Sequence, residues 1–481
     1  MRMRRDAVCS RQQSVGIGWD GQGVTEDRLP CLDMRVLVVG SGGVGSAFVA
    51  IASHREAYDH ITVADIDIER AEEAVETAVN AEGGRIEAAY VDASDEDGVT
   101  ELAVQCRADV ILNACDPRFN PPIFEGAFAA NCHYVDMAMH MSEPHPTKPY
   151  EKTGRRLGDA QFAQHPVWKN RNLMALVGMG VEPGFSDVAA RYAADHLFTR
   201  IDEIGVRDGA DLVVDGYDFA PTFSIWTTIE ECLNPPVIYE RERGWYTTPP
   251  FSEPEIFTFP ADIGALKCVN VEHEEVILIP RWIDVQRVTF KYGLGDEFIN
   301  VLKTLQKLDL VSTDPVEVRG VRVSPRDVVA ATLPDPAELG EKMHGRTCAG
   351  TWVKGIGKDG VPREVYVYHI VDNAWSMREF GHQAVVWQTA VMPAVAIELM
   401  ATGQWMTRGV VGPEALPSEP FLDLLDQHGM EWDFAEYWEK RPAPEREPVS
   451  STAQAVSGTL REPDTGGSAG EAVGVGEGVV E

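Results

Sequence analysis

The sequence lacks the cysteine pattern of a small secreted domain. Its eight cysteines are scattered and form no C-x-x-C pair, which is typical of reduced thiols in a cytoplasmic protein. No apolar run approaches the roughly 18–20 residues that span a bilayer. The basic N-terminal segment also lacks the apolar core of a signal peptide. The sequence therefore predicts a cytoplasmic protein without a membrane partner.

Positive charge is scarce as well. The chain has 42 Lys and Arg residues against 76 Asp and Glu residues, a formal net charge of -34. Because phosphate surfaces repel an acidic protein, this balance argues against nucleic acid and anionic membranes as partners. A length of 481 residues, 44% of them hydrophobic and 25% charged, predicts a globular protein of two or three domains.

The two ends of the chain lack hydrophobic periodicity. Residues 1–33 show neither helical nor strand spacing, so we expect an extension without fixed structure, with translation from Met34 as an alternative. Residues 441–481 are rich in Pro, Gly, Ser and Glu. Such a segment cannot bury enough surface to offset the entropy of ordering it, so we expect a disordered tail.

The middle of the chain contains a clear alternation of strand and helix patterns. A helical stripe over residues 68–84 carries Ile68, Ala71 and Val75 and ends at a glycine pair. Alternation of this kind predicts a doubly wound parallel sheet, the Rossmann fold, over residues 34–180. The predicted strands are residues 35–40, 60–65, 86–93, 109–115, 133–139 and 172–180.

The pattern changes after residue 200. Residues 276–293 and 363–372 alternate in hydrophobicity and predict antiparallel strands of an α+β domain inserted over residues 181–380. A long apolar helix is predicted over residues 383–403, and the helices of residues 381–440 are expected to return to the first domain. The predicted fold class is α/β, an N-terminal Rossmann doubly wound parallel sheet with an inserted α+β second domain.

A glycine-rich loop follows the first predicted strand. Gly40, Gly42 and Gly45 have the spacing G-x-G-x-x-G, with Gly43 and Val44 inside it. The glycines allow a tight turn and let the backbone approach a pyrophosphate at the start of the next helix. This context predicts a dinucleotide site, with an ordinary structural turn as the alternative.

Polar residues at the ends of the next strands bear on the cofactor. Asp65 ends the second strand, where a carboxylate accepts the ribose hydroxyls of NAD and repels the 2'-phosphate of NADP. We therefore expect NAD, with NADP as the second choice, and we assign the cap of the next helix to Asp67. Asp92 and Asn113 end the third and fourth strands and are further cofactor-binding candidates, although Asn113 could simply terminate its strand.

Proton transfer near a nicotinamide requires a group that titrates near neutral pH. His140, in the loop after the fifth strand, is the first candidate, and His369 and Lys291 are further candidates for the same catalytic role. A buried structural role is the alternative for each histidine. The spacing of His133, His140 and His145 fits no zinc pattern, so no metal is predicted.

Four segments together resemble the saccharopine dehydrogenase family, particularly its glutamate-forming saccharopine reductases. They are the glycine fingerprint, "GVEPGFSD", "FSIWTTIEECLNPPVIYERERGWY" and "GVVGPEALPSEPFLDLL". The resemblance extends over about residues 34–430. It implies a Rossmann domain, a second domain for substrate binding and homodimerisation, and a loop with Gly180, Pro183 and Gly184 beside the nicotinamide.

One segment departs from the family's pattern. The reductases carry Phe-Ser-Trp-Ser-Pro-Arg-Gly, whose Arg meets a substrate carboxylate. Here Ser224, Trp226 and Thr227 are predicted to contact substrate, but Glu230 and Glu231 stand where a basic residue is expected. This favours a substrate with an exposed amine, and a solvated helix face is the alternative for the two glutamates. Arg378 is a candidate for holding a substrate carboxylate.

The resemblance implies an NAD(P)-dependent oxidoreductase. It would act on the C–N bond of a small amino-acid-derived secondary amine or imine, in amino-acid metabolism such as that of lysine. Carboxynorspermidine and homospermidine synthases, which handle amines, are the alternative within the family. A non-catalytic dinucleotide-sensing protein is the alternative from another class.

Overall fold

The first part of the chain builds a seven-stranded parallel sheet. The computed structural model describes residues 34–78 and 84–437, so the predictions for residues 1–33 and 441–481 lie outside the described residues. Strand order is β19-β6-β5-β4-β1-β2-β3, with every neighbouring pair parallel. The strands are β1 (Met34–Val39), β2 (Tyr58–Asp65), β3 (Ile86–Tyr90), β4 (Val110–Asn113), β5 (His133–Asp136), β6 (Met174–Leu176) and β19 (Gly409–Val411).

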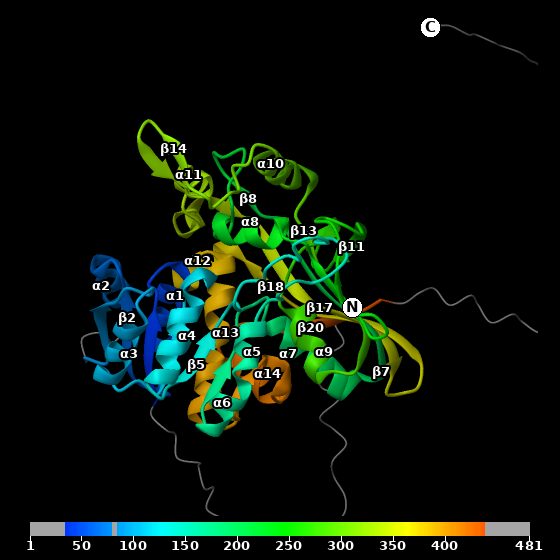
Figure 1. Cartoon of the computed structure of the whole chain (residues 1–481). Coiled ribbons are helices and arrows are strands. Elements are labelled where there is room, and N and C mark those ends of the chain that lie inside the picture. The colour runs from blue at the N-terminus through cyan, green and yellow to red at the C-terminus, as the bar shows by residue number, and fades with distance from the viewer. Residues whose placement is uncertain (1–33, 79–83, 438–481) are drawn as a thin grey trace, which may run out of the picture. The chain divides into compact units, whose positions relative to one another are not determined.

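This order confirms the predicted Rossmann sheet. The chain leaves β1 in one direction toward β3 and then returns to β4 on the other side, so the carboxyl ends of β1 and β4 flank the switch point where ligands bind. Figure 1 shows the helices that accompany these strands. They are α1 (Gly43–Ser53), α2 (Ile68–Glu76), α3 (Glu96–Gln105), α4 (Asn120–Ala129), α5 (Asp159–Ala163) and α6 (His165–Asn170).

Helix α2 is shorter than its sequence pattern predicts. Its start is as expected, because the Asp67 carboxylate caps it by accepting a hydrogen bond from the Glu69 backbone N–H at 3.1 Å. Its end is not, because the helix stops at Glu76 instead of continuing to the glycine pair. Glu76 and Thr77 at this end are exposed, and packing of an apolar face is what stabilises a short helix.

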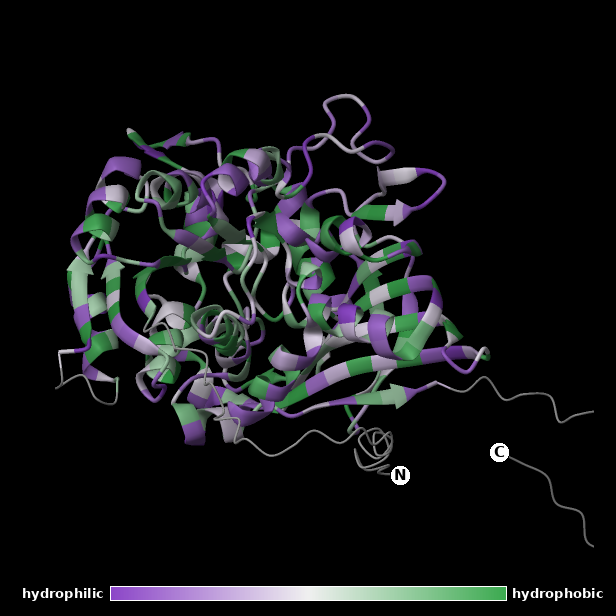
Figure 2. Ribbon diagram, turned by 90° about the horizontal axis from the view of Figure 1, so that it is seen from below, coloured by the Kyte–Doolittle hydropathy of each residue, from purple (hydrophilic) through white to green (hydrophobic). Residues whose placement is uncertain are grey.

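A nine-stranded mixed sheet forms the second part of the fold. Its main path is β10-β9-β13-β7-β17-β18-β20, and only β13 and β7 run parallel. Figure 2 shows alternate hydrophobic and hydrophilic bands along the long strands, as expected where the two sheet faces differ in burial. The strands are β7 (Phe198–Ala210), β9 (Val237–Glu240), β10 (Gly244–Thr247), β11 (Glu255–Phe259), β12 (Gly264–Asn270), β13 (Val285–Gly293), β17 (Arg346–Gly357), β18 (Pro362–Asp372) and β20 (Trp432–Glu436).

The strand prediction for residues 276–293 is half wrong. Residues Val285–Gly293 form β13 as expected, but Glu275–Trp282 form helix α9. The run Val276–Ile279 is apolar without alternation and is completely buried. A short continuous apolar run suits a buried helix as well as a strand, so periodicity alone could not separate the two. This error matters because α9 begins beside the site described below.

The remaining elements connect or cover the two sheets. Two short two-stranded sheets pair β14 with β15 and β8 with β16. These strands are β8 (Val213–Val214), β14 (Val316–Val318), β15 (Val321–Val323) and β16 (Met343–His344), and the helices are α7 (Phe185–Tyr192), α8 (Ile225–Leu233), α10 (Asp296–Lys307), α11 (Pro325–Thr332), α12 (Asn373–Phe380) and α14 (Ser418–Gln427).

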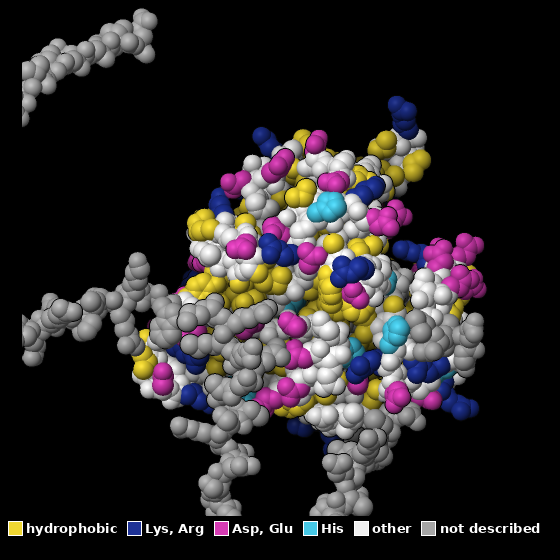
Figure 3. All heavy atoms as spheres, turned by 180° about the vertical axis from the view of Figure 1, so that it is seen from behind, with side chains coloured by type: hydrophobic (Ala, Val, Ile, Leu, Met, Phe, Trp, Pro, Cys, Tyr) yellow, Lys and Arg dark blue, Asp and Glu magenta, His cyan; other side chains and the backbone are white. Residues whose placement is uncertain are grey.

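The long apolar helix predicted near the C-terminus is α13 (Ala384–Ala401). By length and composition it could cross a membrane, but 89% of it is buried inside the protein, as in the core helix of a soluble protein. It packs against α1, and the Tyr58 hydroxyl donates a hydrogen bond to the Ala394 carbonyl at 2.7 Å. On the outside, Figure 3 shows acidic and basic side chains interspersed over the visible face.

A half-buried ion cluster fastens α13 to α1 and α14. Both oxygens of Glu398 bond the Arg55 guanidinium, at 2.8 and 2.9 Å, and His428 Nε2 lies 3.0 Å from Glu398 Oε2. Burial opposes the charge of Glu398, but the bonds from His428 and Arg55 outweigh it and lower its pKa to about 2. The folded state therefore holds this carboxylate ionised at pH values where the unfolded chain protonates it.

We expect Glu398→Gln to lower the free energy of unfolding at pH 7 by about 2–3 kcal/mol. A depressed carboxyl pKa stabilises the fold above the unfolded value of 4.5 and ceases to do so as the pH falls toward 2. Urea unfolding of wild type and variant at several pH values measures this difference. A difference that stays constant from pH 7 to pH 3 would show that the ion cluster is not its source.

Candidate active site

The glycine loop between β1 and α1 has the geometry that a dinucleotide needs. Gly40 has φ +101°, and a Cβ at Gly45 would lie 1.9 Å from the Gly40 carbonyl oxygen, so these two glycines close the turn. A Cβ at Gly43 would touch Val386 of α13 at 3.4 Å. Gly42 caps the helix and has open space at its Cβ position, where a pyrophosphate can approach the backbone.

Asp65 lies against this loop. Its carboxylate accepts hydrogen bonds from the Ser41 N–H at 2.7 Å, the Ser41 hydroxyl at 2.9 Å and the Asp67 N–H at 3.0 Å. Burial opposes its charge, but these hydrogen bonds lower its pKa below the usual value. A fixed negative charge therefore sits at the end of β2, where a Rossmann fold places the adenosine ribose.

The other two predicted cofactor-binding residues at strand ends, Asp92 and Asn113, form hydrogen bonds with neighbouring residues. Asp92 is half-buried and accepts hydrogen bonds from the backbone N–H and the hydroxyl of Ser94 at 2.9 and 2.7 Å. Asn113 is buried, donates to Asn120 Oδ1 at 2.6 Å and to the Tyr134 hydroxyl at 3.0 Å, and accepts from the Cys115 N–H. Asn113 thus holds the loop after β4, and its side chain has few hydrogen bonds left for a cofactor.

The loop that follows β6 is held tightly. The Gly180 N–H donates to the Pro183 carbonyl at 2.7 Å, and the Gly184 N–H donates to Asp187 Oδ2 at 2.9 Å. Gly184 has φ +131°, and a Cβ there would lie 1.9 Å from the Gly180 oxygen, so no other residue fits this turn. The loop stands at the carboxyl edge of the parallel sheet, the same edge as the glycine loop.

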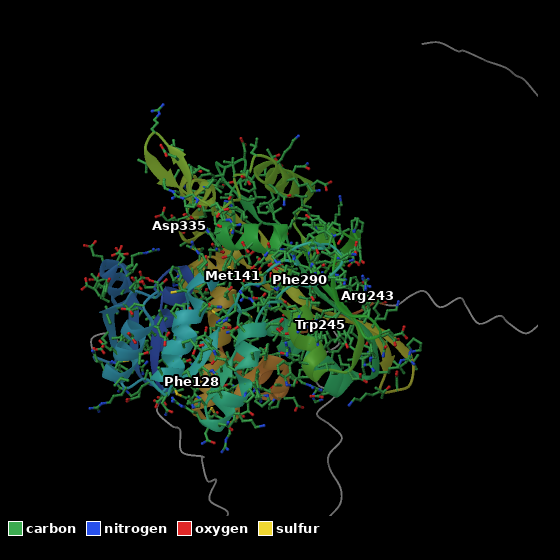
Figure 4. The ribbon with its side chains drawn as sticks, in the orientation of Figure 1. Phe128, Met141, Arg243, Trp245, Phe290 and Asp335 are labelled. Carbon is green, nitrogen blue, oxygen red and sulfur yellow. The ribbon has the colours of Figure 1, made fainter. Side chains whose placement is uncertain are left out.

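A pocket of about 410 Å³, a volume that includes space open to solvent, lies between this sheet edge and the second part of the fold. One wall comes from the turn after β4 and the loop after β5, which contributes Met141 (Figure 4). The facing wall comes from one side of α8 and from the turn before α9. The lining residues are Pro117, Ala138, Met139, Met141, Ser142, Leu157, Trp226, Thr227, Glu230, Glu231, Asn234, Glu272 and Glu274.

Three carboxyl groups in this wall have unusual surroundings. Glu272 Oε2 accepts hydrogen bonds from the Ser142 hydroxyl at 2.8 Å and from Asn234 Nδ2 at 3.0 Å. Glu274 Oε1 accepts the Met139 N–H at 3.0 Å, which ties the wall to the loop after β5. Among the described residues, no hydrogen-bond donor contacts the Glu231 carboxyl, which is partly exposed in the pocket.

These carboxyl groups hold their protons more tightly than free glutamate does. Burial raises the pKa of Glu231 to about 8, with His273 opposing the shift and neighbouring glutamates adding to it. Burial also raises the pKa of Glu272 to about 7, against the hydrogen bonds from Ser142 and Asn234. The pKa of Glu274 is raised by burial and by Glu275. An ammonium group entering the pocket would lower all three pKa values, so its binding is coupled to the release of protons from these groups.

His273 lies behind the pocket wall as a buried cation. Its Nδ1 is 2.6 Å from Glu275 Oε2 and 3.5 Å from Glu274 Oε2, and its ring stacks on Phe290 (Figure 4) at 3.7 Å. Burial opposes its charge, but Glu275 and Glu274 outweigh burial and raise its pKa to about 10. In the described residues this trio is also the one group whose ligand atoms, all within 4.8 Å, could hold a metal.

The structure places the three predicted proton-transfer residues outside the pocket lining. His140 follows Met139, but its ring packs edge-on against Phe124, and burial lowers its pKa to about 4. His369 is buried on β18 beside Gln388, and burial lowers its pKa to about 3. Both imidazoles are therefore neutral at pH 7. Lys291, on β13, bonds Glu255 Oε2 at 2.7 Å.

The predicted substrate residues divide into two groups. Trp226, Thr227 and Glu230 line the pocket, together with Glu231. Ser224 does not, because its hydroxyl caps α8 by accepting the Thr227 N–H at 3.4 Å. Arg378 does not either, because it is exposed on α12 and paired with Glu379.

Sequence reasoning missed the second carboxyl cluster. Glu272, Glu274 and their neighbours form the run "EHEE" between a strand and an apolar helix. Four consecutive titratable residues next to a buried segment are uncommon because burying a charge is costly. That run was the signal available in the sequence. Its distance of some 40 residues from α8 hid the fact that both segments face one pocket.

Comparisons with known proteins agree with this geometry. Residues 36–176 match the saccharopine dehydrogenase NADP binding domain, and residues 180–430 match the saccharopine dehydrogenase C-terminal domain. Carboxynorspermidine synthase of Vibrio cholerae is 30% identical over 413 residues, covering 84% of this chain and 97% of that one. Carboxyaminopropylagmatine dehydrogenase of Synechocystis is 28% identical over 399 residues, 83% of this chain and 96% of that one.

Solved structures show the same fold at low identity. Saccharopine dehydrogenase (L-Glu forming) from Saccharomyces cerevisiae has a TM-score of 0.61 at 13% identity and covers 84% of this chain and 100% of that one. Homospermidine synthase from Legionella pneumophila, in complex with NAD, has a TM-score of 0.57 at 14% identity, with coverages of 87% and 96%.

The family matches and the relatives identify an NAD(P)-dependent dehydrogenase or reductase acting on CH–NH groups, and the Rossmann fold and glycine loop agree with this class. The chain belongs to the saccharopine dehydrogenase family. Both the enzyme class and the family are those that the sequence motifs imply.

Proposed function

We propose that the enzyme forms or oxidises the C–N bond of a carboxylated polyamine, a secondary amine made from an amino-acid aldehyde and a diamine. The observation that carries this proposal is the set of pocket carboxyl groups, Glu231, Glu272 and Glu274. In their ionised forms, Glu272 and Glu274 attract ammonium groups and repel the dicarboxylic substrate that saccharopine chemistry requires, and Glu231 carries a proton at neutral pH. The relatives named for carboxynorspermidine and carboxyaminopropylagmatine support the same choice.

The residues of the chain supply binding, orientation and a proton. A bound nicotinamide cofactor supplies or accepts the hydride. Gly42 and the start of α1 hold the pyrophosphate, and the loop with Gly184 completes the wall at the same sheet edge. Glu272, fixed by two hydrogen bonds, receives an ammonium group of the diamine.

Glu231 is the proton donor in this proposal, in place of His140. An imine must be protonated to accept hydride, and a carboxyl group with a pKa of about 8 still carries its proton at neutral pH. In the oxidative direction the ionised carboxylate takes the proton from the secondary amine. One group thus serves both directions.

Substrate choice can be tested by mixing carbonyl and amine compounds with NADH or NADPH. We expect cofactor oxidation with L-aspartate semialdehyde and 1,3-diaminopropane or agmatine, and at least tenfold slower oxidation with 2-aminoadipate semialdehyde and glutamate. Faster turnover of the latter pair would reject the polyamine proposal and return the chain to saccharopine chemistry.

We further propose that NAD is preferred over NADP because of the charge on Asp65. Asp65→Ser should reduce the difference in binding free energy between NADH and NADPH by about 1.5–3 kcal/mol, the contribution of a charge-assisted hydrogen bond. Fluorescence titration with NADH and NADPH measures the two dissociation constants. Asp59→Ser, at the opposite end of β2, is the matched control. Tighter binding of NADPH than NADH to the wild type would contradict the assignment.

We also propose that the enzyme is cytoplasmic and forms a homodimer. The cysteines of the described residues are all free thiols, which suits a reducing cytoplasm. A homodimer is expected from the family resemblance. Light scattering of the purified enzyme should give twice the chain mass of 52.9 kDa, and a monomer at micromolar concentration would reject it.

A further inference from the structure

Two arginine side chains stack on the ring of Trp226, which lines the pocket. The guanidinium carbon of Arg118, from the turn after β4, is 4.0 Å from the ring centroid. That of Arg326, from α11, is 4.4 Å from it. The two arginines come from the two different parts of the fold, and each touches the pocket wall. Arg118 follows the lining residue Pro117 in the chain, and the Arg326 side chain bonds the lining residue Glu230.

Each arginine has one carboxylate partner and open donors besides. Arg118 Nε donates to Asp116 Oδ1 at 2.9 Å, and the side chain is 40% exposed. Arg326 bonds Glu230 through Nη1 and the Val311 carbonyl through Nε at 2.7 Å. Within the described part of the chain, Nη1 and Nη2 of Arg118 and Nη2 of Arg326 donate to no protein acceptor.

The charges around Trp226 differ from those of the adjoining pocket wall. Two arginines and two carboxylates, Asp116 and Glu230, balance each other at Trp226. Glu272 adjoins this group, because Asn234 Nδ2 donates to Glu230 Oε1 at 3.1 Å and to Glu272 Oε2 at 3.0 Å. A molecule with a zwitterionic part and a neighbouring amine matches this arrangement.

We propose that Arg118 and Arg326 bind the α-carboxylate of the amino-acid half of the substrate, with its α-ammonium group on Asp116 or Glu230. This inference deepens the proposed function and rests on it. Guanidinium groups with free planar donors suit a carboxylate, which they can bind through two parallel hydrogen bonds. The diamine half then binds beside Glu231 and Glu272, which line the same pocket.

The same cluster accounts for the departure of the sequence from the reductase pattern. Glu230 stands where that pattern has a basic residue, yet a guanidinium still reaches this place because Arg326 approaches it from α11. A carboxylate receptor is therefore retained, although the residue that supplies it lies about 100 residues later in the chain.

The test compares two carbonyl substrates that differ only in the carboxylate. With saturating 1,3-diaminopropane and NAD(P)H, kcat/KM is measured for L-aspartate semialdehyde and for 3-aminopropanal. We expect Arg118→Gln and Arg326→Gln each to reduce the preference for the carboxylated aldehyde roughly 10- to 100-fold, mainly through KM. The KM of the diamine should change less than twofold.

Two further variants separate recognition from structure. Arg171→Gln, which removes an arginine stacked on Phe128 away from the pocket, is the matched control and should leave the preference unchanged. Arg326→Lys keeps the charge without the planar fork and should regain only part of the preference. Because Arg118 is exposed, its exchange tests the inference even if a change at Arg326 prevents folding.

The possible results distinguish failure of this inference from failure of the proposed function. Equal losses for both aldehydes, or a change confined to the KM of the diamine, would overturn the carboxylate assignment and leave the arginines as a structural contact between the two parts of the fold. A wild type that turns over neither aldehyde with any diamine would overturn the proposed function and this inference together.

Discussion

Glu231→Gln is expected to reduce imine reduction at pH 7 by about 10²- to 10⁴-fold, the usual cost of losing a general acid. The variant keeps the shape of the side chain but cannot give up a proton. Binding of the cofactor should not change, because Glu231 lies in the wall of α8 and not in the glycine loop. The measurement is kcat with saturating aldehyde and diamine, together with the dissociation constant of NAD(P)H.

The pH dependence of the wild type identifies the same group. A carboxyl group with a pKa of about 8 loses its proton above that pH, so kcat/KM for reduction should fall on the alkaline side of pH 8 and the Gln variant should lack that fall. Glu242→Gln, in the exposed turn between β9 and β10, should behave as wild type. Turnover of Glu231→Gln within twofold of wild type would assign proton transfer to another group.

Stability separates this catalytic role from a structural one. The folded pKa of about 8 exceeds the unfolded value of 4.5, so the folded chain keeps a proton that the unfolded chain releases. Stability therefore decreases as the pH rises from 4.5 to 8. The Gln variant escapes this loss and should melt at a higher temperature than wild type at pH 8. A lower melting temperature would indicate that Glu231 supports the fold.

Gly45→Ala is expected to destabilise the protein by about 3 kcal/mol or more and to abolish cofactor binding. The new Cβ would lie 1.9 Å from the Gly40 carbonyl oxygen, a backbone atom that cannot move without opening the turn between β1 and α1. Thermal unfolding and NAD(P)H fluorescence titration measure the two effects.

Gly42→Ala in the same loop is the matched variant, which we expect to lose affinity for the cofactor without losing stability. No protein atom lies within 4 Å of its Cβ position, and its φ of -62° suits alanine, so the melting temperature should not change. Affinity for NAD(P)H should fall roughly tenfold or more because the methyl group occupies the approach of the pyrophosphate. A stable variant with unchanged affinity would show that the cofactor does not lie on this loop.

The parts of the fold that sequence could predict are those set by local patterns. The Rossmann strands, the cap at Asp67 and the helix now seen as α13 follow from hydrophobic spacing and from single side chains that bond their own backbone. The segment at Val276 was mistaken because a buried apolar run carries no period. Its environment, and not its own sequence, decides between helix and strand.

The site itself was only partly predictable. Trp226, Thr227 and Glu230 belong to one motif on one helix, and all three line the pocket. Histidines were the predicted proton donors because their usual pKa suits the task, and burial lowers the pKa of His140, which packs against Phe124, to about 4, which is why we propose Glu231 instead. The same physical effect raises the pKa of Glu231 toward neutrality. Which ionisable group suits catalysis therefore depends on burial, which a local sequence pattern does not reveal.

The most direct test of the account uses NAD(P)H that carries deuterium at the transferred position of the nicotinamide. The enzyme is supplied with L-aspartate semialdehyde and 1,3-diaminopropane, and the product is examined by mass spectrometry and NMR. We predict a secondary amine that carries one deuterium on the former aldehyde carbon, which is now bonded to the amine nitrogen. Deuterium found only in an alcohol, or no labelled product with any diamine, would contradict the conclusion that this pocket performs C–N chemistry on a carboxylated polyamine.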